Sequence, residues 1–395
     1  MPRSRETFDV HPEWVQLQFE EYSPIQEVYG FSSTKGIITV EGVRYLPQGK
    51  TSKSLVIFMH PASTQTILPV PRVMAQHGLH VLAAGSRYTR NDTSLIMEKV
   101  LRDLAAYVRH AKEVWGYEKI VLAGWSGGGS LMTFYQSQAE RPTIKATPAG
   151  DPVDVAGWGL IPADGVIFHA AHISRALVLL DFLDPSVLDE SNPDIRDPEL
   201  DLYDPRNPNK PPYTAAYLAQ YRAAQRQRME RRTTWVKCML EELKKRGTVE
   251  NERGFITHRT LADPRYLDAS IDPSDRKIGM SFVGEPQAAN VAPAGLARFS
   301  TLRSWLSQWS VNDTHVHAER NVREISVPFM TIDNTADDVV LGPQIERVNK
   351  AAKSANKAHY TIKGANHYYA GQPELLLAAF DHYTSWMRSV GLLLD

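Results

Sequence analysis

One serine in this chain stands among glycines at the end of an apolar run. KIVLAG is followed by Trp125, Ser126 and three glycines, so residues 124–128 read G-x-S-x-G. A strand-to-helix turn this tight strains its central residue and needs small neighbours so that the two backbones can pass. The hydroxyl is then displayed at the strand end, near the free N–H groups of a helix N-terminus. The pattern predicts that Ser126 is a nucleophile.

A serine hydroxyl is a weak nucleophile without a base, and the C-terminal part of the chain offers one. His367 follows a predicted strand and a short loop containing Gly364, and it precedes the last predicted helix. Three carboxylates, Asp333, Asp337 and Asp338, lie near the end of the preceding predicted strand. Where a serine stands on such a turn, the acid and then the histidine come from later strand ends. His367 is the predicted base, and one of the three aspartates is the predicted acid.

Strands and helices alternate around these residues. Short apolar runs predict strands at 54–60, 80–85, 119–124, 165–171, 325–333 and 358–363. Apolar residues at helical spacing predict helices at 68–77, 94–115, 130–138, 343–355 and 373–390. This alternation indicates an α/β fold, a mostly parallel sheet flanked by helices, with ligands bound beyond the carboxyl ends of the strands. IQEVYG and GIITVEGVRYLP predict a β-meander leading into the sheet.

The alternation breaks in the middle of the chain. An acidic, proline-rich stretch is followed by one long helical pattern from Thr214 to Arg246 and by a shorter predicted helix at 296–309. We therefore predict a core formed by residues 1–171 and 325–395, interrupted by a large, mainly helical cap, residues 172–324.

Together these motifs resemble the serine hydrolases of the α/β-hydrolase superfamily. The resemblance covers about residues 25–171 and 325–395 and rests on HPAS, GWSGG, NTADD and GANH in the expected order. It implies the α/β-hydrolase fold, a Ser–Asp–His triad and a cap after the sixth strand. The acid turn of this superfamily commonly reads G-x-x-D, which implies Asp337 as the acid, with Asn334 in the glycine position as a residue that tolerates left-handed geometry. The alternative is that Asp338 is the acid and Asp337 caps the next helix.

Acyl transfer by such a serine creates an oxyanion that needs two donors. The N–H group of Gly127, directly after the nucleophile, is one predicted donor. The other is expected from the loop after His60, where the superfamily usually has His-Gly and this chain has HPAS. Pro61 has no N–H group, so Ala62 is the predicted donor, with Ser63 behind it. We interpret His60 as structural, holding the loop, rather than as a second base.

Several further side chains are candidates for the substrate pocket. Trp125 precedes the nucleophile, His60 and Ser63 belong to the HPAS loop, His172 follows a predicted strand, and Trp305 belongs to an aromatic stripe in the cap. For both tryptophans packing is the simpler interpretation, because a stripe at helical spacing usually forms a core.

The composition narrows the class of protein. The chain has 395 residues, is 43% hydrophobic and carries a formal net charge of −1, which favours neither nucleic acid nor a membrane surface as a partner. Its one cysteine, Cys238, cannot form an intrachain disulfide, and no apolar run approaches the ~20 residues of a membrane span. We expect a cytoplasmic protein that acts on a small molecule without a metal or other cofactor, and the long helix could join two subunits in a homodimer.

The function that these residues predict is hydrolysis of a carboxylic ester or lactone of a small, largely apolar molecule through an acyl-enzyme on Ser126. The triad does not fix the leaving group, so cleavage of an amide or of a C–C bond remains an alternative. A further alternative is a non-catalytic protein that has the same fold and only binds a ligand.

Overall fold

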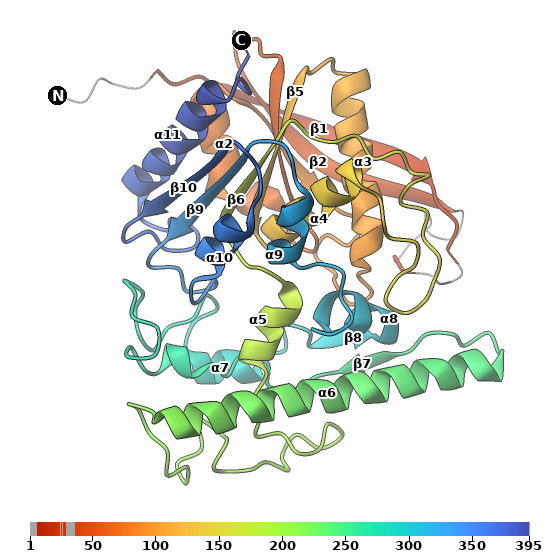
Figure 1. The fold of residues 1–395 in the computed structure, drawn as a ribbon, viewed down its shortest axis with the longest axis vertical. Coiled ribbons are helices and arrows are strands. Elements are labelled where there is room, and N and C mark those ends of the chain that lie inside the picture. Colours follow the sequence, from red (N-terminus) through yellow and green to blue (C-terminus); the bar gives the residue numbers. More distant parts are fainter. Residues whose placement is uncertain (1–5, 24, 26, 29–35, 395) are drawn as a thin grey trace.

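The computed structural model describes residues 6–23, 25, 27, 28 and 36–394. Its centre is an eight-stranded sheet in the order β1-β2-β4-β3-β5-β6-β9-β10 (Figure 1). The strands are β1 (Val10–Glu20), β2 (Ile37–Pro47), β3 (Ser54–His60), β4 (His80–Gly85), β5 (Lys119–Ser126), β6 (Gly165–Ala171), β9 (Phe329–Asn334) and β10 (Lys357–Ile362). The pairs β1–β2 and β2–β4 are antiparallel and the other neighbours are parallel, so the sheet is mostly parallel as predicted.

The six strands predicted in the α/β core are all present, and the central ones are buried on both faces. Every residue of β6 is buried, which is why its sequence is a continuous apolar run rather than an alternating one. The predicted first strand of the meander is wrong: Ile25, Glu27 and Val28 are not in a strand, and the rest of IQEVYG lies outside the described residues. The partner of β2 is β1, an edge strand with many exposed polar residues. A search for apolar runs does not detect such a strand.

Helices cover both faces of the sheet (Figure 1). The helices α3 (Met97–Glu113), α4 (Gly127–Glu140) and α10 (Gln344–Ala351) pack on one face, and α2 (Pro69–Gln76) and α11 (Pro373–Ser389) pack on the other. Each has an apolar side in one of two hydrophobic clusters, for example Leu104 and Leu131 in the first and Met74 and Tyr383 in the second. These five helices lie where helical spacing predicts them.

The cap lies at one end of the sheet and begins with α5 (Arg175–Phe182), as Figure 1 shows. Its largest element is α6 (Ala215–Arg246), a helix of 32 residues that runs along the outer side of the cap. The hydroxyl of Thr214 caps its first turn, and Gly247 ends it with a φ of 60°. The cap has its own hydrophobic core, which includes Leu179, Leu240 and Trp305.

The cap returns to the core earlier than the predicted boundary at residue 325. Val316, Ala318 and Val322 pack in the same hydrophobic cluster as β6 and α4.

The other elements of the described chain are short. They are 3-10 helices at Gln65–Ile67, Pro264–Tyr266 and Val322–Glu324, a π-helical turn at Trp305–Trp309, the helices α7 (Pro286–Val291), α8 (Leu302–Ser304) and α9 (Ala318–Asn321), and the strands β7 (Gly254–Ile256) and β8 (Phe299–Thr301).

The predicted helix at 296–309 is therefore wrong in its first half. Residues 299–301 form β8, which pairs with β7 about forty-five residues earlier in the chain. The helix starts only after Thr301, whose hydroxyl caps the N–H group of Ser304, and it continues as a π-helical turn. A pairing partner this distant cannot be read from local spacing.

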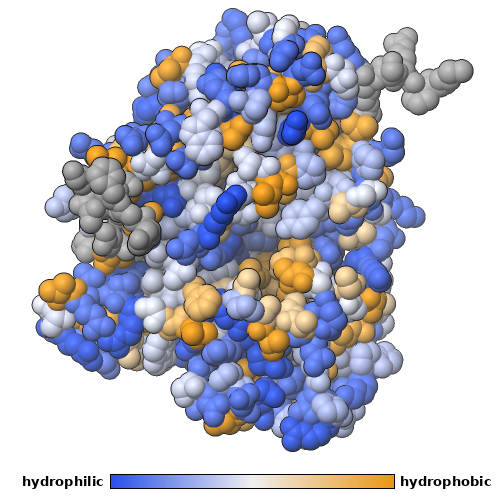
Figure 2. Space-filling model, turned by 180° about the vertical axis from the view of Figure 1, so that it is seen from behind, coloured by the Kyte–Doolittle hydropathy of each residue, from blue (hydrophilic) through white to orange (hydrophobic). Residues whose placement is uncertain are grey.

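The surface of the molecule is mixed. On the face shown in Figure 2, apolar residues lie in small patches among hydrophilic ones. No helix in the described part of the chain combines the length and the apolar character that crossing a bilayer requires. A homodimer through α6 stays a prediction.

Candidate active site

Ser126 occupies a strained turn between β5 and α4. It has φ 53° and ψ −125°, a conformation that costs a non-glycine residue roughly 1–3 kcal/mol. A Cβ atom on Gly124 would lie 2.4 Å from the Cα of Gly129, and one on Gly128 would lie 2.5 Å from the carbonyl oxygen of Met59. Both obstacles are backbone atoms, so only glycine fits at either position. This is the strand–turn–helix arrangement that the G-x-S-x-G pattern predicts.

The loops after β9 and β10 bring a carboxylate and an imidazole together. The Nδ1 atom of His367 donates to Oδ2 of Asp337 at 2.9 Å, and both side chains are buried. The other oxygen of Asp337, Oδ1, accepts the N–H groups of Val339 and Val340. One carboxylate thus both orients the imidazole and caps the following turn. Asp338 contacts Tyr266 through its backbone oxygen instead, and burial together with the charge of Asp337 raises its pKa.

Asn334 supports this pair in a different way from the one expected. Its backbone is not left-handed, because β9 continues through it and pairs Asn334 with Ile362. Its side chain ties the His367 loop to the strand: Nδ2 donates to the carbonyl of Asn366, and Oδ1 accepts the hydroxyl of Tyr369. A glycine at this position could make neither bond.

No hydrogen bond joins Ser126 to the imidazole of His367. The ring of Trp125, directly before the serine, packs edge-to-face against His367 with centroids 6.1 Å apart. The Nε2 atom of His367 is buried without a hydrogen-bond partner among the described residues. In ligand-free sites this bond is commonly long or misaligned and tightens only when substrate binds.

The HPAS loop turns two of its backbone N–H groups toward the imidazole of its own histidine, His60. The N–H groups of Ala62 and Ser63 both donate to Nδ1 of His60, at 3.0 and 2.9 Å. The loop carbonyls are held as well, that of Pro61 by the Ser86 hydroxyl and that of Ala62 by the N–H group of Arg90. His60 thus holds the loop, while the N–H group expected to bind an oxyanion is already engaged. Gly127, at the first position of α4, has no partner for its N–H group within the helix.

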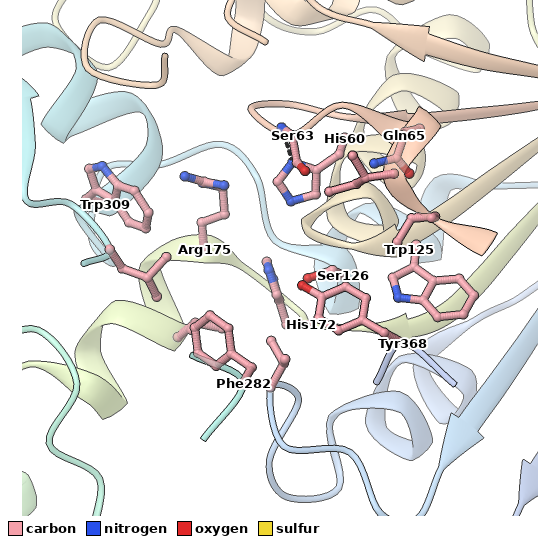
Figure 3. Close-up of a pocket in the computed structure, with 15 residues that line it drawn as sticks. His60, Ser63, Gln65, Trp125, Ser126, His172, Arg175, Phe282, Trp309 and Tyr368 are labelled. Atoms are coloured by element: carbon pink, nitrogen blue, oxygen red, sulfur yellow. Dashed lines mark hydrogen bonds between the residues drawn. The ribbon is translucent and has the colours of Figure 1, made fainter. Parts of the chain in front are cut away.

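A cavity of about 180 Å³ opens in front of Ser126 (Figure 3). Four of the five pocket candidates line it: Trp125, His60, Ser63 and His172. Trp305 does not. It is buried in the core of the cap, where its indole N–H donates to Thr233 at 3.0 Å. Packing, the simpler interpretation of the stripe, holds for Trp305, whereas Trp309 at the end of the same stripe reaches the cavity.

Sequence reasoning missed other residues of the cavity wall. The core contributes Gln65, Ile67, Leu68, Val339 and Tyr368, and the cap contributes Arg175, Val178, Phe282, Leu296 and Trp309. The core residues lie in the same loops as the predicted site residues, so their positions in the chain could have predicted that they line the cavity. Nothing in the local sequence marks Phe282 or Leu296, because their place depends on how the cap folds over the core.

Arg175 is a buried cation on this wall. Its Nη2 atom donates to Asp92 at 2.5 Å, its Nε atom donates to Gln308 at 3.1 Å, and the guanidinium lies 4.4 Å from the ring centre of Trp309. Figure 3 shows it between Trp309 and His60 at the side of the cavity. Burial and the charge of Arg175 lower the pKa of His172 to about 3, so His172 is neutral near pH 7.

A second buried histidine lies behind the site. His169 packs against Trp125 with ring centroids 4.2 Å apart, and its nitrogens contact the hydroxyls of Tyr383 and Tyr369 at 3.1 and 3.0 Å. Burial lowers its pKa to about 3. It therefore supports the floor of the site as a neutral ring. Within the described residues, no three His, Cys, Asp or Glu side chains gather as metal ligands would.

Comparisons with known proteins address the fold. No protein-family model and no curated protein sequence matches this chain. Among solved structures, GrgF, an α/β hydrolase from Penicillium sp. sh18, is similar with a TM-score of 0.52 and 13% identity over 96% of this chain and 99% of that one. DcsB in complex with its substrate analogue is similar with a TM-score of 0.51 and 12% identity over 96% of this chain and 100% of that one.

At these identities the likeness shows the fold alone. The order of the mostly parallel sheet, the turn at Ser126 after β5 and the similarity to these structures agree on it. This chain has the α/β-hydrolase fold, with a large, mainly helical insertion after β6.

The turn at Ser126 depends on glycine at position 128. Gly128→Ala places a methyl group 2.5 Å from a backbone oxygen, so we expect the free energy of unfolding to fall by about 1–3 kcal/mol. Gly254→Ala is the matched control, because the nearest atom to its added methyl group is 3.9 Å away, and its effect should stay within about 0.5 kcal/mol. Urea unfolding followed by circular dichroism measures both, and equal stability of the two variants would contradict the close approach.

The buried, neutral His169 should make stability depend on pH. Its pKa is about 3 in the folded protein and about 6.5 in the unfolded chain, so between these values only the unfolded chain binds the proton. Its contribution to stability is therefore lost as pH falls from about 6.5 toward 3, by up to about 1.4 kcal/mol per pH unit. In His169→Gln, which does not titrate, urea unfolding between pH 4 and 7 should show a shallower slope. An unchanged slope would refute the assignment.

On the prediction that Ser126 is a nucleophile and His367 its base, the two adjacent aspartates should differ in their effect on turnover. Asp337→Asn keeps an oxygen for the turn but no longer favours the required imidazole tautomer, so turnover of an ester should fall by about 10⁴-fold. Asp338→Asn is the matched control and should change turnover only a few-fold. Steady-state kinetics of the two purified variants measures this, and the reverse order of effects would make Asp338 the acid.

Proposed function

We propose that this protein is a serine hydrolase that cleaves a carboxylic ester or lactone of a small, largely apolar molecule through an acyl-enzyme on Ser126. The observation that carries the proposal is the strained serine at the wall of a cavity, together with a buried Asp337–His367 pair whose imidazole packs against Trp125, the residue before the serine. A strained backbone conformation at a non-glycine residue persists only where the surrounding structure enforces it. Such strained residues are common at functional sites.

The proposed reaction has two halves. Oγ of Ser126 attacks the substrate carbonyl while Nε2 of His367 takes its proton, and the imidazolium then returns that proton to the leaving alcohol. Asp337 accepts from Nδ1 throughout, so it holds the imidazole with Nε2 free to accept and stabilises the charge that forms. A water molecule then attacks the acyl-enzyme by the same route. The first step requires the serine hydroxyl to rotate or shift into hydrogen-bond reach of Nε2.

The cavity supports a small substrate. Its volume is about 180 Å³, and its walls are mainly apolar, with Leu68, Val178, Phe282 and Leu296 among them. The guanidinium of Arg175 offers one charged donor at the side, which can donate to a carbonyl, hydroxyl or carboxylate oxygen of the substrate. These features favour a compact apolar acyl group with one polar end.

The alternatives differ in the bond that breaks. An amide or a C–C bond would use the same nucleophile and the same proton carrier, because the shape of the pocket chooses the leaving group. Matched ester, lactone, amide and β-diketone substrates of one acyl group separate these reactions by their values of kcat/KM. A ligand-binding protein on this fold would turn over none of them and would leave a fluorophosphonate probe unreacted.

Replacement of Ser126 tests the proposal directly. The wild-type chain should gain the mass of one fluorophosphonate adduct, and Ser126→Ala should neither react with the probe nor retain more than a trace of ester hydrolysis, a loss of several orders of magnitude. Intact-mass spectrometry and steady-state kinetics measure the two effects. Ser130→Ala, buried in the first turn of the helix that follows Ser126, is the matched control and should keep both properties. Wild-type hydrolysis by purified Ser126→Ala would rule out the proposed nucleophile.

A further inference from the structure

The tautomer of His60 follows from its neighbours. Two backbone N–H groups, from Ala62 and Ser63, point at its Nδ1 atom from 3.0 and 2.9 Å. A nitrogen that accepts must carry a lone pair, and a neutral imidazole has one such nitrogen and one N–H group. The proton of His60 is therefore on Nε2. Burial and the charge of Arg175 lower its pKa well below 6.5, which keeps the ring neutral.

This tautomer decides what His60 can do at the site. Its lone pair faces the loop, so the nitrogen that faces the other way can donate a hydrogen bond but cannot take the proton of the serine. His367 has the opposite arrangement, because its Nδ1 atom donates to Asp337 and its Nε2 atom is left to accept. His60 is thus set up as a hydrogen-bond donor and His367 as a base.

The Nε2 edge of His60 lies against the residue after the nucleophile. A Cβ atom on Gly127 would be 2.6 Å from Nε2, closer than to either neighbouring ring carbon, at 3.2 and 3.3 Å. His60 and Ser126 line the same cavity, and Figure 3 shows the ring beside Ser126 with its other nitrogen toward Ser63. Within the described chain, Nε2 of His60 makes no hydrogen bond, although Nδ1 makes two.

Residues 61–63 of the HPAS loop leave no free backbone N–H group for the same task. Pro61 has no N–H group, and those of Ala62 and Ser63 are engaged by the imidazole. The carbonyls of Pro61 and Ala62 are also bound, so turning a peptide plane toward Ser126 would break further hydrogen bonds. A donor supplied by a side chain fills the position that a loop N–H group would otherwise take.

We propose that the Nε2–H group of His60 is the second donor to the oxyanion, beside the N–H group of Gly127 and in place of that of Ala62. This inference rests on the proposed function, because an oxyanion forms only when Ser126 attacks a carbonyl. The ring donates while neutral, is held by two hydrogen bonds and needs no reorganisation during the reaction, which are the conditions under which an oxyanion donor is most effective.

Two substitutions separate this role from that of holding the loop. In His60→Asn, the side-chain oxygen can replace Nδ1 as the acceptor for Ala62 and Ser63, but no atom reaches the position of Nε2. In His60→Gln, the longer amide can place an N–H group near that position while giving up the loop contacts. His60→Ala removes both.

We expect His60→Asn to unfold at the same urea concentration as the wild type and to lose about 10²–10³-fold in kcat, with KM little changed. Binding of phenylboronic acid, which forms a tetrahedral adduct on an active serine, should weaken in parallel, because the adduct uses the same donors as the oxyanion. His60→Gln should recover part of kcat relative to His60→Ala.

Two results would overturn the inference. One is wild-type kcat in His60→Asn. The other is a loss of kcat that parallels the loss of stability across the three variants while the affinity for phenylboronic acid stays unchanged. A residue that only holds the loop in place would give this result. Failure of the proposed function is distinct: the wild-type chain itself would then neither hydrolyse esters nor react with a fluorophosphonate.

Discussion

The site depends on the close approach of two backbones at the end of the sheet. The last residues of β5 and the first turn of α4 pass within van der Waals contact of each other and of the end of β3, and each contact requires glycine. Gly124 faces Gly129, Gly128 faces the carbonyl of Met59, and Gly127 faces the ring of His60. A side chain at position 124 or 128 would push the helix away from the strands, and one at position 127 would displace the ring of His60. Because it stays close, Ser126 is held in its strained conformation at the wall of the cavity.

Around this turn, polar groups are buried with their protonation states fixed by their partners. Asp337 divides its two oxygens between His367 and the following turn, and Asn334 joins strand β9 to the loop that carries His367. His169 and His172 are kept neutral by burial, and His172 also by the charge of Arg175. A buried polar group without a partner is costly, so these hydrogen bonds make the arrangement specific as well as stable. The cap completes the enclosure, because Arg175 and Trp309 close one side of the cavity.

Where prediction from the sequence failed, the reason was a partner distant in the chain. Strand β1 is an exposed edge that exists because β2 offers it hydrogen bonds, and β8 exists because β7 does. Trp305 and Trp309 belong to one stripe, yet one packs inside the cap and the other lines the cavity. The engagement of the Ala62 N–H group by His60 also depends on a distant segment. The HPAS loop is held by bonds to Ser86 and Arg90, which lie in the loop after the neighbouring strand β4.

The amino-acid sequence by itself determined the parallel strands and flanking helices of the α/β core, the presence of an insertion after β6, the long helix with both of its ends, and the turn at Ser126. These features are local: apolar runs, helical spacing, caps and glycines act over a few residues and can be read in order. Only the tertiary structure decided which aspartate contacts His367, which tryptophan reaches the cavity, and that Arg175 lies beside it. It also decided which nitrogen of His60 carries the proton. Each of these depends on segments far apart in the chain meeting in one place, and burial there fixes orientations and charges that no single segment specifies.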